Sequence, residues 1–254
     1  MPIRQFAADR LAVEVHARRD ELGRAAAERA ARILGETIAR EGHAAMVFAA
    51  AASQNEFLAA LRGDRSIAWP RVTAFHMDEY AGIAATHPAS FRRFLRERLM
   101  DYVPLAAFHE LRGDAADLAA EAARYAKLLA QTPPALAAMG IGENGHLAFI
   151  DPHECDFEDP CDVKLVLLDD RCRMQQVHDG AFERIEDVPR RALSLTVPFF
   201  LRTAHAVVCV PGRAKRAAVQ AALEGPIAEC CPASALRRHA DAVLYLDCES
   251  AGIP

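Results

Sequence analysis

The side chains best suited to chemistry are concentrated in residues 138–152, AMGIGENGHLAFIDP. An apolar run, residues 134–139, leads into a glycine-rich loop that carries Glu143, Asn144, His146 and Asp151. Glycines allow tight turns and close approach of a ligand, and an imidazole between carboxylates can move protons on a small molecule. The alternative is a tight turn in which His146 is merely hydrogen-bonded. The number of polar groups favours a catalytic or binding loop.

A second group of acidic side chains follows another apolar segment. Residues 71–75 predict a strand, and the chain runs directly from it into HMDEY, which contains Asp78 and Glu79. Open α/β sheets place catalytic groups at the carboxyl ends of their strands. The acidic pair is therefore a second candidate for catalysis.

Two segments have the pattern of an anion site, in which a buried strand is followed by a helix. Residues 44–52 are a continuous apolar run, and Ser53-Gln54-Asn55-Glu56 then begins a predicted capped helix. Free N–H groups at such a helix start attract anions, although a plain helix cap is the alternative. Residues 206–210 similarly precede a helix that begins at Arg213 and carries Lys215 in its first turn. A solvated lysine is the alternative there.

The elements that must position these residues alternate between strands and helices, without an internal repeat. That order predicts an α/β fold, a three-layer αβα sandwich with a mainly parallel, Rossmann-like sheet, in a single domain over residues 1–254. Apolar positions at helical spacing predict a long helix over residues 8–41, broken near Gly23. Further strands are predicted at 163–168 and 242–246, and further helices at 57–61, 91–99 and 117–129.

Composition limits the possible partners and the compartment. The 254 residues carry a formal net charge of -5 and are 52% hydrophobic, which argues against nucleic acid or an anionic membrane as a partner. The N-terminal stretch does not resemble a signal peptide, and no apolar stretch has the length of a membrane span. The seven cysteines are scattered without a CxxC pair, so neither a disulfide framework nor a zinc site is predicted. We expect a cytoplasmic protein.

The loop and its neighbours resemble the glucosamine-6-phosphate deaminase family, whose signature is G-x-G-x-[DN]-G-H-[IL]-[AG]-F-N-[ED]-P. Residues 140–152 match this signature except at Ile150, where the family usually has asparagine. Residues 75–80, FHMDEY, resemble the family's [FN]-x-M-D-E-Y, and residues 87–91 resemble H-P-x-S-[FY]. The phosphate loop P-T-G-G-[ST]-P is altered, because Ala49–Gln54 lacks its glycines and keeps only the hydroxyl of Ser53. The resemblance spans roughly residues 44–247.

The resemblance implies an enzyme that opens the ring of glucosamine 6-phosphate, isomerises it and releases ammonia, leaving fructose 6-phosphate. It implies no metal and no organic cofactor. Asp78 is then the base at C2, with Glu79 holding the strand end or the substrate. His146 serves ring opening, oriented by Asp151 and assisted by Asn144, which supplies no charge where some relatives carry aspartate.

The substrate is then a small-molecule sugar phosphate, and the family resemblance allows a homo-oligomer. The family's phosphate-binding lysine corresponds to Lys215. The resemblance also implies an arginine that grips the phosphate; His178 stands at that position, with Arg173 and Arg184 as other candidates. The other expected substrate-binding residues lie in the two loops: Ala51, Ala52, Ser53, Gln54, Gly142 and Gly145. Three alternatives stay open: a 6-phosphogluconolactonase, a sugar-phosphate sensor without turnover, and an enzyme for another hexosamine phosphate.

Overall fold

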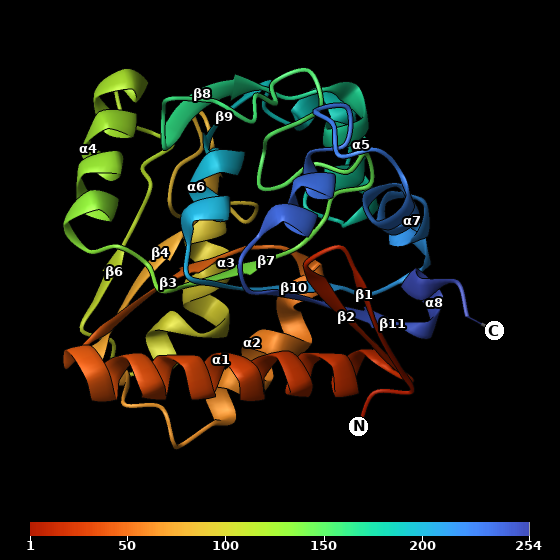
Figure 1. The fold of residues 1–254 in the computed structure, drawn as a ribbon. Helices are drawn as coiled ribbons and strands as arrows, with labels where there is room; N and C mark the ends of the chain where they lie inside the picture. Colours follow the sequence, from red (N-terminus) through yellow and green to blue (C-terminus); the bar gives the residue numbers. More distant parts are fainter. Residues whose placement is uncertain (254) are drawn as a thin grey trace.

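An eight-stranded sheet forms the middle layer of the protein, which a computed structural model describes over residues 1–253 (Figure 1). Its strand order is β1-β2-β11-β10-β7-β3-β4-β6, and every neighbouring pair except β1 and β2 is parallel. The sheet confirms the predicted α/β class. The strands are β1 (Arg4–Ala8), β2 (Leu11–His16), β3 (Ala44–Phe48), β4 (Val72–His76), β6 (Ala107–His109), β7 (Leu136–Met139), β10 (His205–Val210) and β11 (Ala242–Asp247).

Helices cover both faces of this sheet. In Figure 1, α1 (Arg19–Glu41) and α2 (Asn55–Gly63) lie below it, and α4 (Leu118–Gln131), α6 (Val197–Arg202) and α7 (Arg216–Glu224) lie above it. Strands such as β3 and β10 are almost wholly buried, because a parallel sheet covered on both faces has no solvated side. The remaining helices are α3 (Phe91–Arg98), α5 (Asp170–His178) and α8 (Cys248–Ala251).

A second, smaller sheet stands beside the first and was not predicted. It is antiparallel, with the order β5-β9-β8, and comprises β5 (Asp78–Tyr80), β8 (Val163–Leu167) and β9 (Arg191–Leu195). Met77 alone separates β4 from β5. Its N–H donates to Phe48 of the large sheet, and its carbonyl accepts from Leu195 of the small sheet. One residue thus joins the two sheets.

The helix predicted over residues 8–41 is wrong at both its start and its break. Residues 4–16 form the antiparallel hairpin of β1 and β2, in which Leu11, Val13 and Val15 point into the core. Their spacing of two and the β-branched side chains of Val13 and Val15 are typical of a strand, and this pattern outweighed the helical spacing.

Helix α1 also continues through Gly23 without a break. A Cβ atom at Gly23 would lie 2.7 Å from the Cβ of Glu56 and 2.8 Å from the backbone nitrogen of Phe57. Gly23 is therefore a point of close approach between α1 and α2.

The parallel register brings the carboxyl ends of four strands to the same edge. Phe48 pairs with His76 and with Ala138, and Met139 pairs with Val208. The segments after β3, β4, β7 and β10 must therefore meet, and these are the segments that carry the candidate chemistry. Across residues 1–253, no helix combines the length and apolar character needed to cross a bilayer.

Candidate active site

The segments after β3, β4, β7 and β10 border one cavity at the carboxyl edge of the large sheet. The cavity brings together the candidate base, the candidate imidazole and the two candidate anion sites. The predicted site residues that line it are Ala51, Ser53, Asp78, Gly142, His146 and Lys215. Seven other predicted site residues are not part of its lining: Ala52, Gln54, Glu79, Asn144, Gly145, Asp151 and His178.

Asp78 opens β5 and faces the cavity from a buried position, with 7% of its surface exposed. Burial raises the pKa of its carboxyl well above the ordinary value of 3.8, and the charge of Glu79 raises this pKa further. A carboxylate that binds a proton this readily is suited to act as a base on a carbon acid.

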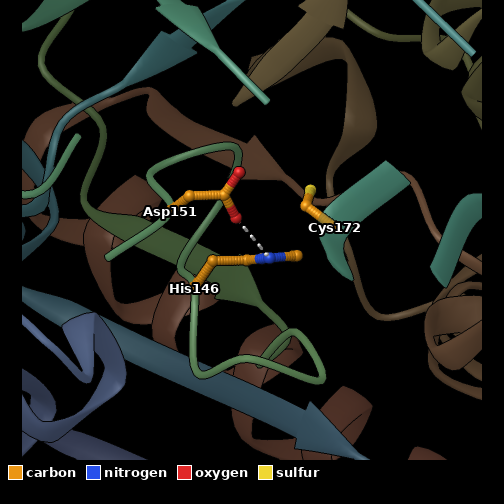
Figure 2. A group of neighbouring side chains, drawn as sticks. All are labelled: His146, Asp151 and Cys172. Atoms are coloured by element: carbon orange, nitrogen blue, oxygen red, sulfur yellow. Dashed lines mark ion pairs between the residues drawn. The ribbon is translucent and has the colours of Figure 1, made fainter. Parts of the chain in front are cut away.

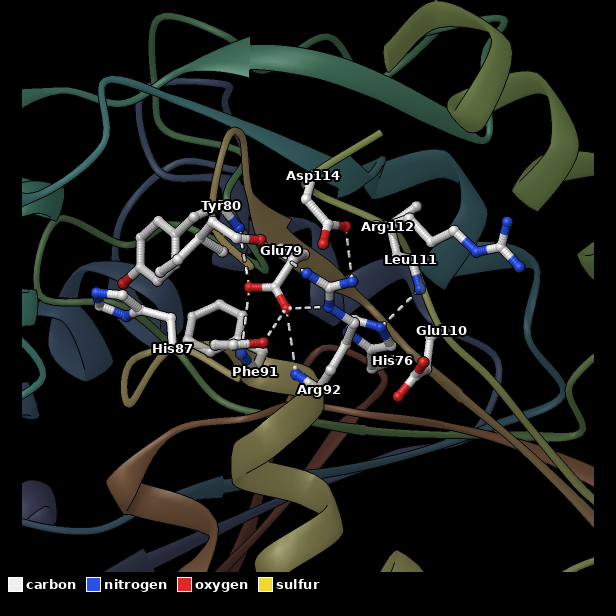
Figure 3. A network of polar contacts seen from close by, with 12 residues as sticks. His76, Glu79, Tyr80, His87, Phe91, Arg92, Glu110, Leu111, Arg112 and Asp114 are labelled. Atoms are coloured by element: carbon white, nitrogen blue, oxygen red, sulfur yellow. Dashed lines mark hydrogen bonds and ion pairs between the residues drawn. The ribbon is translucent and has the colours of Figure 1, made fainter. Parts of the chain in front are cut away.

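Glu79 faces away from the cavity and holds the start of α3 (Figure 3). Its carboxylate accepts hydrogen bonds from the Ser90 hydroxyl and from the backbone N–H groups of Phe91 and Arg92, and it pairs with the Arg92 guanidinium at 3.1 Å. Burial raises the pKa of Glu79, while these donors act to lower it. Of the two expected roles, the contacts support holding the strand end, because both carboxylate oxygens already accept from β5 and α3.

His76, the last residue of β4, is a structural histidine (Figure 3). Its Nε2 accepts from the N–H of Leu111, so its Nδ1 must carry the proton that is donated to the carbonyl of Asp78 at 2.9 Å. Complete burial lowers the pKa of His76 to about 3. The neutral ring therefore fixes the backbone beneath the Asp78 carboxylate.

His146 and Asp151 face each other across the loop after β7 (Figure 2). The His146 Nδ1 lies 3.2 Å from Asp151 Oδ1, and the carboxylate is fully buried. Burial acts to raise the pKa of Asp151, but His146, Asn144 and the Asp169 N–H together bring this pKa below its ordinary value. Asp151 is therefore an ionised carboxylate beside the imidazole.

Asn144 acts on Asp151 and does not touch the ring of His146 through its own side chain. Its amide nitrogen donates to Asp151 at 2.8 Å and to Asp169 at 2.9 Å, and its oxygen accepts from the backbone N–H of His146. An amide between two carboxylates supplies donors where an aspartate would add a third negative charge. Asn144 thus links the loop to Asp169, which caps α5 by accepting from Cys172.

The glycines of the loop have separate roles. A Cβ atom at Gly142 would lie 2.2 Å from the His146 ring, so only glycine lets the imidazole lie against the backbone. Gly145 has a φ of 87° and lies against Cys231, where a Cβ would meet the sulfur at 2.9 Å. Gly145 is not part of the cavity's lining, and its positive φ shapes the turn of the loop.

Strand β3 ends earlier than predicted, and the helix that follows it is not capped by a side chain. The strand stops at Phe48, and a 3-10 turn at Ala52–Gln54 precedes α2. The side chain of Gln54 is buried and donates to Ser53 Oγ and to the carbonyls of Met139 and Cys209. It anchors the loop to two strand ends, while the N–H groups that begin the turn have no partner within it.

Lys215 also lines the cavity, from a 3-10 turn before α7. Only 8% of its surface is exposed. Burial lowers the pKa of its ammonium group, and the carboxylates of Asp179 and Glu143 oppose this shift. A buried cation of this kind gains from an anionic ligand, which compensates for its desolvation.

His178 does not reach the cavity. It is the last residue of α5, its side chain is 57% exposed, and its Nδ1 lies 3.6 Å from Glu143. The inner face of α5 instead presents Gln175 and Gln176, which line the cavity and which the sequence analysis missed. Gln176 accepts from the Tyr80 hydroxyl and Gln175 accepts from the Glu143 N–H, so both amide groups are fixed in place.

The structure thus defines an α/β sandwich with an acid–base site at the carboxyl edge of its sheet. The sequence model of the glucosamine-6-phosphate isomerases/6-phosphogluconolactonase family matches residues 17–245. The chain belongs to this family, which confirms the resemblance carried by the loop motifs.

Relatives in this family are named after the deaminase reaction. The chain is 35% identical to a glucosamine-6-phosphate deaminase of Exiguobacterium sp. over 176 residues, which cover 69% of this chain and 67% of that one. It is 34% identical to the deaminase of Streptococcus sanguinis over 179 residues, which cover 70% and 74%.

Solved structures give the same fold. A monomeric glucosamine-6-phosphate deaminase has a TM-score of 0.86 and 27% identity, covering 95% of this chain and 99% of that one. The 6-phosphogluconolactonase of Trypanosoma brucei has a TM-score of 0.76 and 18% identity, covering 94% and 97%. The second likeness is one of fold alone.

Proposed function

We propose that this protein converts glucosamine 6-phosphate, or a close hexosamine 6-phosphate, with water into fructose 6-phosphate and ammonia. The observation that carries the proposal is that Asp78 and His146, which come from different strands, line one cavity. The deaminase relatives and the match of the loop to the family signature support the same reaction.

In this reaction His146 opens the sugar ring by moving a proton at the ring oxygen. Asp151 lies behind the imidazole, 3.2 Å from Nδ1, and its charge stabilises the protonated ring while the proton is carried. Asn144 and the Asp169 N–H fix Asp151 in turn. Reorientation of the imidazole is thereby limited.

Asp78 then takes the proton from C2 and returns it to C1, which converts the aldose into a ketose imine. Water adds to the imine carbon, and ammonia leaves. The apolar surroundings that raise the Asp78 pKa make its carboxylate a stronger base for this transfer than a solvated one. Phe91 and Phe149 line the cavity and restrict access of water to it.

The phosphate is held by Lys215 and by the backbone N–H groups of residues 51–53. Ser53 contributes its hydroxyl, and no arginine is needed in this arrangement. The amides of Gln175 and Gln176 are placed to bind sugar hydroxyls. Binding energy from these remote groups positions C1 and C2 against Asp78.

The test is ammonia release from a panel of hexosamine 6-phosphates, with 6-phosphogluconolactone hydrolysis measured on the same protein. We expect ammonia from glucosamine 6-phosphate and no lactone hydrolysis. The opposite pattern would support the lactonase alternative. Saturable sugar-phosphate binding without either reaction would support the sensor alternative.

The Asp78→Asn variant identifies the base. It should bind the sugar phosphate with little change but lose about 10²- to 10⁴-fold in kcat, because a general base is removed and shape is kept. Asp101→Asn, an exposed surface change, is the matched control and should retain activity. Turnover by Asp78→Asn at the wild-type rate would contradict the assignment.

A further inference from the structure

A third donor side chain stands beside the His146–Asp151 pair. Cys172 projects from the first turn of α5 toward the same space (Figure 2). One ligand atom each from His146, Asp151 and Cys172 lies within 4.8 Å of the other two, and all three residues are buried. The proposed reaction uses the imidazole and the carboxylate but gives the thiol no role.

One ring nitrogen of His146 has no hydrogen-bond partner and is free to bind a ligand. The Nδ1 of His146 is buried without a hydrogen-bond partner, although Asp151 Oδ1 is only 3.2 Å away, because the two groups are not aligned for a hydrogen bond. The His146 side chain is 92% buried, so water does not readily satisfy this nitrogen. A ligand between the three residues would satisfy it.

The charge around the cluster favours a cation. The carboxylates of Asp151 and Asp169 lie beside Cys172, and together with burial they raise the pKa of its thiol well above 9.0. The same negative surroundings that oppose a thiolate attract a divalent ion, which stabilises the thiolate when it binds.

We propose that His146, Asp151 and Cys172 form a binding site for a thiophilic divalent cation of the zinc class, and that occupation of this site inhibits the enzyme. Three mixed nitrogen, oxygen and sulfur ligands with one open position match the ligand sets of zinc sites. Binding forms a metal–sulfur bond and releases the thiol proton to solvent. The ion is an inhibitor, distinct from a cofactor.

The geometry requires only a small adjustment. Ligand atoms around a tetrahedral zinc ion are about 3.3 to 3.8 Å apart, given bond lengths of roughly 2.0 to 2.3 Å. The His146–Asp151 separation of 3.2 Å is already close to this range. The sulfur lies within 4.8 Å of the other two ligand atoms, so it must approach them by at most about 1.5 Å. The inhibitory part of the inference rests on the proposed function, since it depends on His146 opening the ring.

Metal binding is tested directly on the full chain, independently of turnover. Equilibrium dialysis with ZnCl₂ measures affinity, and titration with CdCl₂ measures the ultraviolet charge-transfer band of a cadmium–thiolate bond. Cys172→Ser should weaken zinc binding by about 100-fold or more and remove the cadmium band, because loss of even an outer-shell partner costs roughly 10- to 100-fold. Cys230→Ser is the control, since Cys230 is an exposed free thiol outside the cluster.

His146→Ala provides a second variant that keeps the thiol, and it should weaken zinc binding to a similar extent. Zinc should also inhibit ammonia release by the wild type and by Cys230→Ser, but not by Cys172→Ser. Unchanged zinc affinity in both Cys172→Ser and His146→Ala would overturn the site. Zinc binding that requires Cys172 in a protein that releases no ammonia would instead contradict the proposed function and leave the site standing.

Discussion

At the scale of single residues, the catalytic assignments depend on how burial changes protonation. Asp78 has a raised pKa and must be ionised to act as a base. The activity should therefore fall as the pH is lowered through this raised pKa, well above the pH at which a solvated carboxylate takes up its proton. The measurement is the pH profile of kcat/KM, and an acidic limb near pH 3.8 would contradict the assignment.

Glu79→Gln should move that acidic limb to lower pH. The substitution removes the like charge that raises the Asp78 pKa, while glutamine retains an oxygen for the Ser90 hydroxyl and the N–H groups at the start of α3. Thermal unfolding of the same variant controls for loss of structure, because Arg92 also loses its partner there. If the variant is folded and the acidic limb of its pH profile stays at the wild-type pH, the Glu79 charge does not raise the Asp78 pKa.

The raised pKa of Asp78 should also lower the free energy of unfolding at neutral pH. The folded protein binds the Asp78 proton more tightly than the unfolded chain, so ionisation above pH 3.8 lowers the free energy of unfolding until the folded-state pKa is passed. Asp78→Asn should therefore be more stable than the wild type at neutral pH and should converge with it at low pH. Urea unfolding at several pH values measures this, and a less stable variant at neutral pH would contradict it.

The cavity residues that belong to sequence motifs could be predicted from the sequence, whereas the cavity residues contributed by α5 could not. Asp78, His146 and Lys215 lie at the ends of apolar runs, and parallel strands deliver such ends to one edge. Gln175 and Gln176 carry no such signal, because which face of a short helix points inward is decided by how α5 is docked through Asp169. His178 was misassigned for the same reason.

At the scale of elements, the contact between α1 and α2 positions the start of α2, where the loop that we propose binds phosphate ends. Gly23→Ala should destabilise the fold by about 1 to 3 kcal/mol, because the added methyl group meets the backbone of α2. Gly35→Ala is a matched control in the same helix, where nothing lies within 4 Å of the added atom.

The Gly35→Ala control should raise the free energy of unfolding by about 0.5 to 1 kcal/mol, because alanine has a higher helix propensity than glycine. Denaturant unfolding of both variants gives the two free energies. Equal effects at the two positions would show that the close approach of the helices does not limit the side chain at Gly23.

The order of the central strands and helices was predictable from apolar runs and the turns between them. The N-terminal hairpin was not, because Leu11 and Val15 fit both a helical and an alternating pattern over so short a stretch. The small antiparallel sheet was also missed. Its strands β5 and β9 lie far apart in the sequence, and their pairing depends on long-range contacts.

At the scale of the whole molecule, the two sheets should unfold together. The protein has one tryptophan, Trp69, which is buried just before β4 at one side of the large sheet. We expect the urea transition followed by Trp69 fluorescence to coincide with that followed by far-ultraviolet circular dichroism. Two separated transitions would contradict the prediction of a single domain over residues 1–254, of which Pro254 lies outside the described residues.

The one-residue connection at Met77 has a consequence for how this enzyme can change its specificity. Asp78 belongs to the small sheet, whereas His146 follows a strand of the large one, and Met77 is hydrogen-bonded to both. The span between base and imidazole is therefore set by the tilt of one sheet against the other. Substitutions in β8 or β9, remote from any sugar, can alter that span while every group facing the substrate keeps its identity.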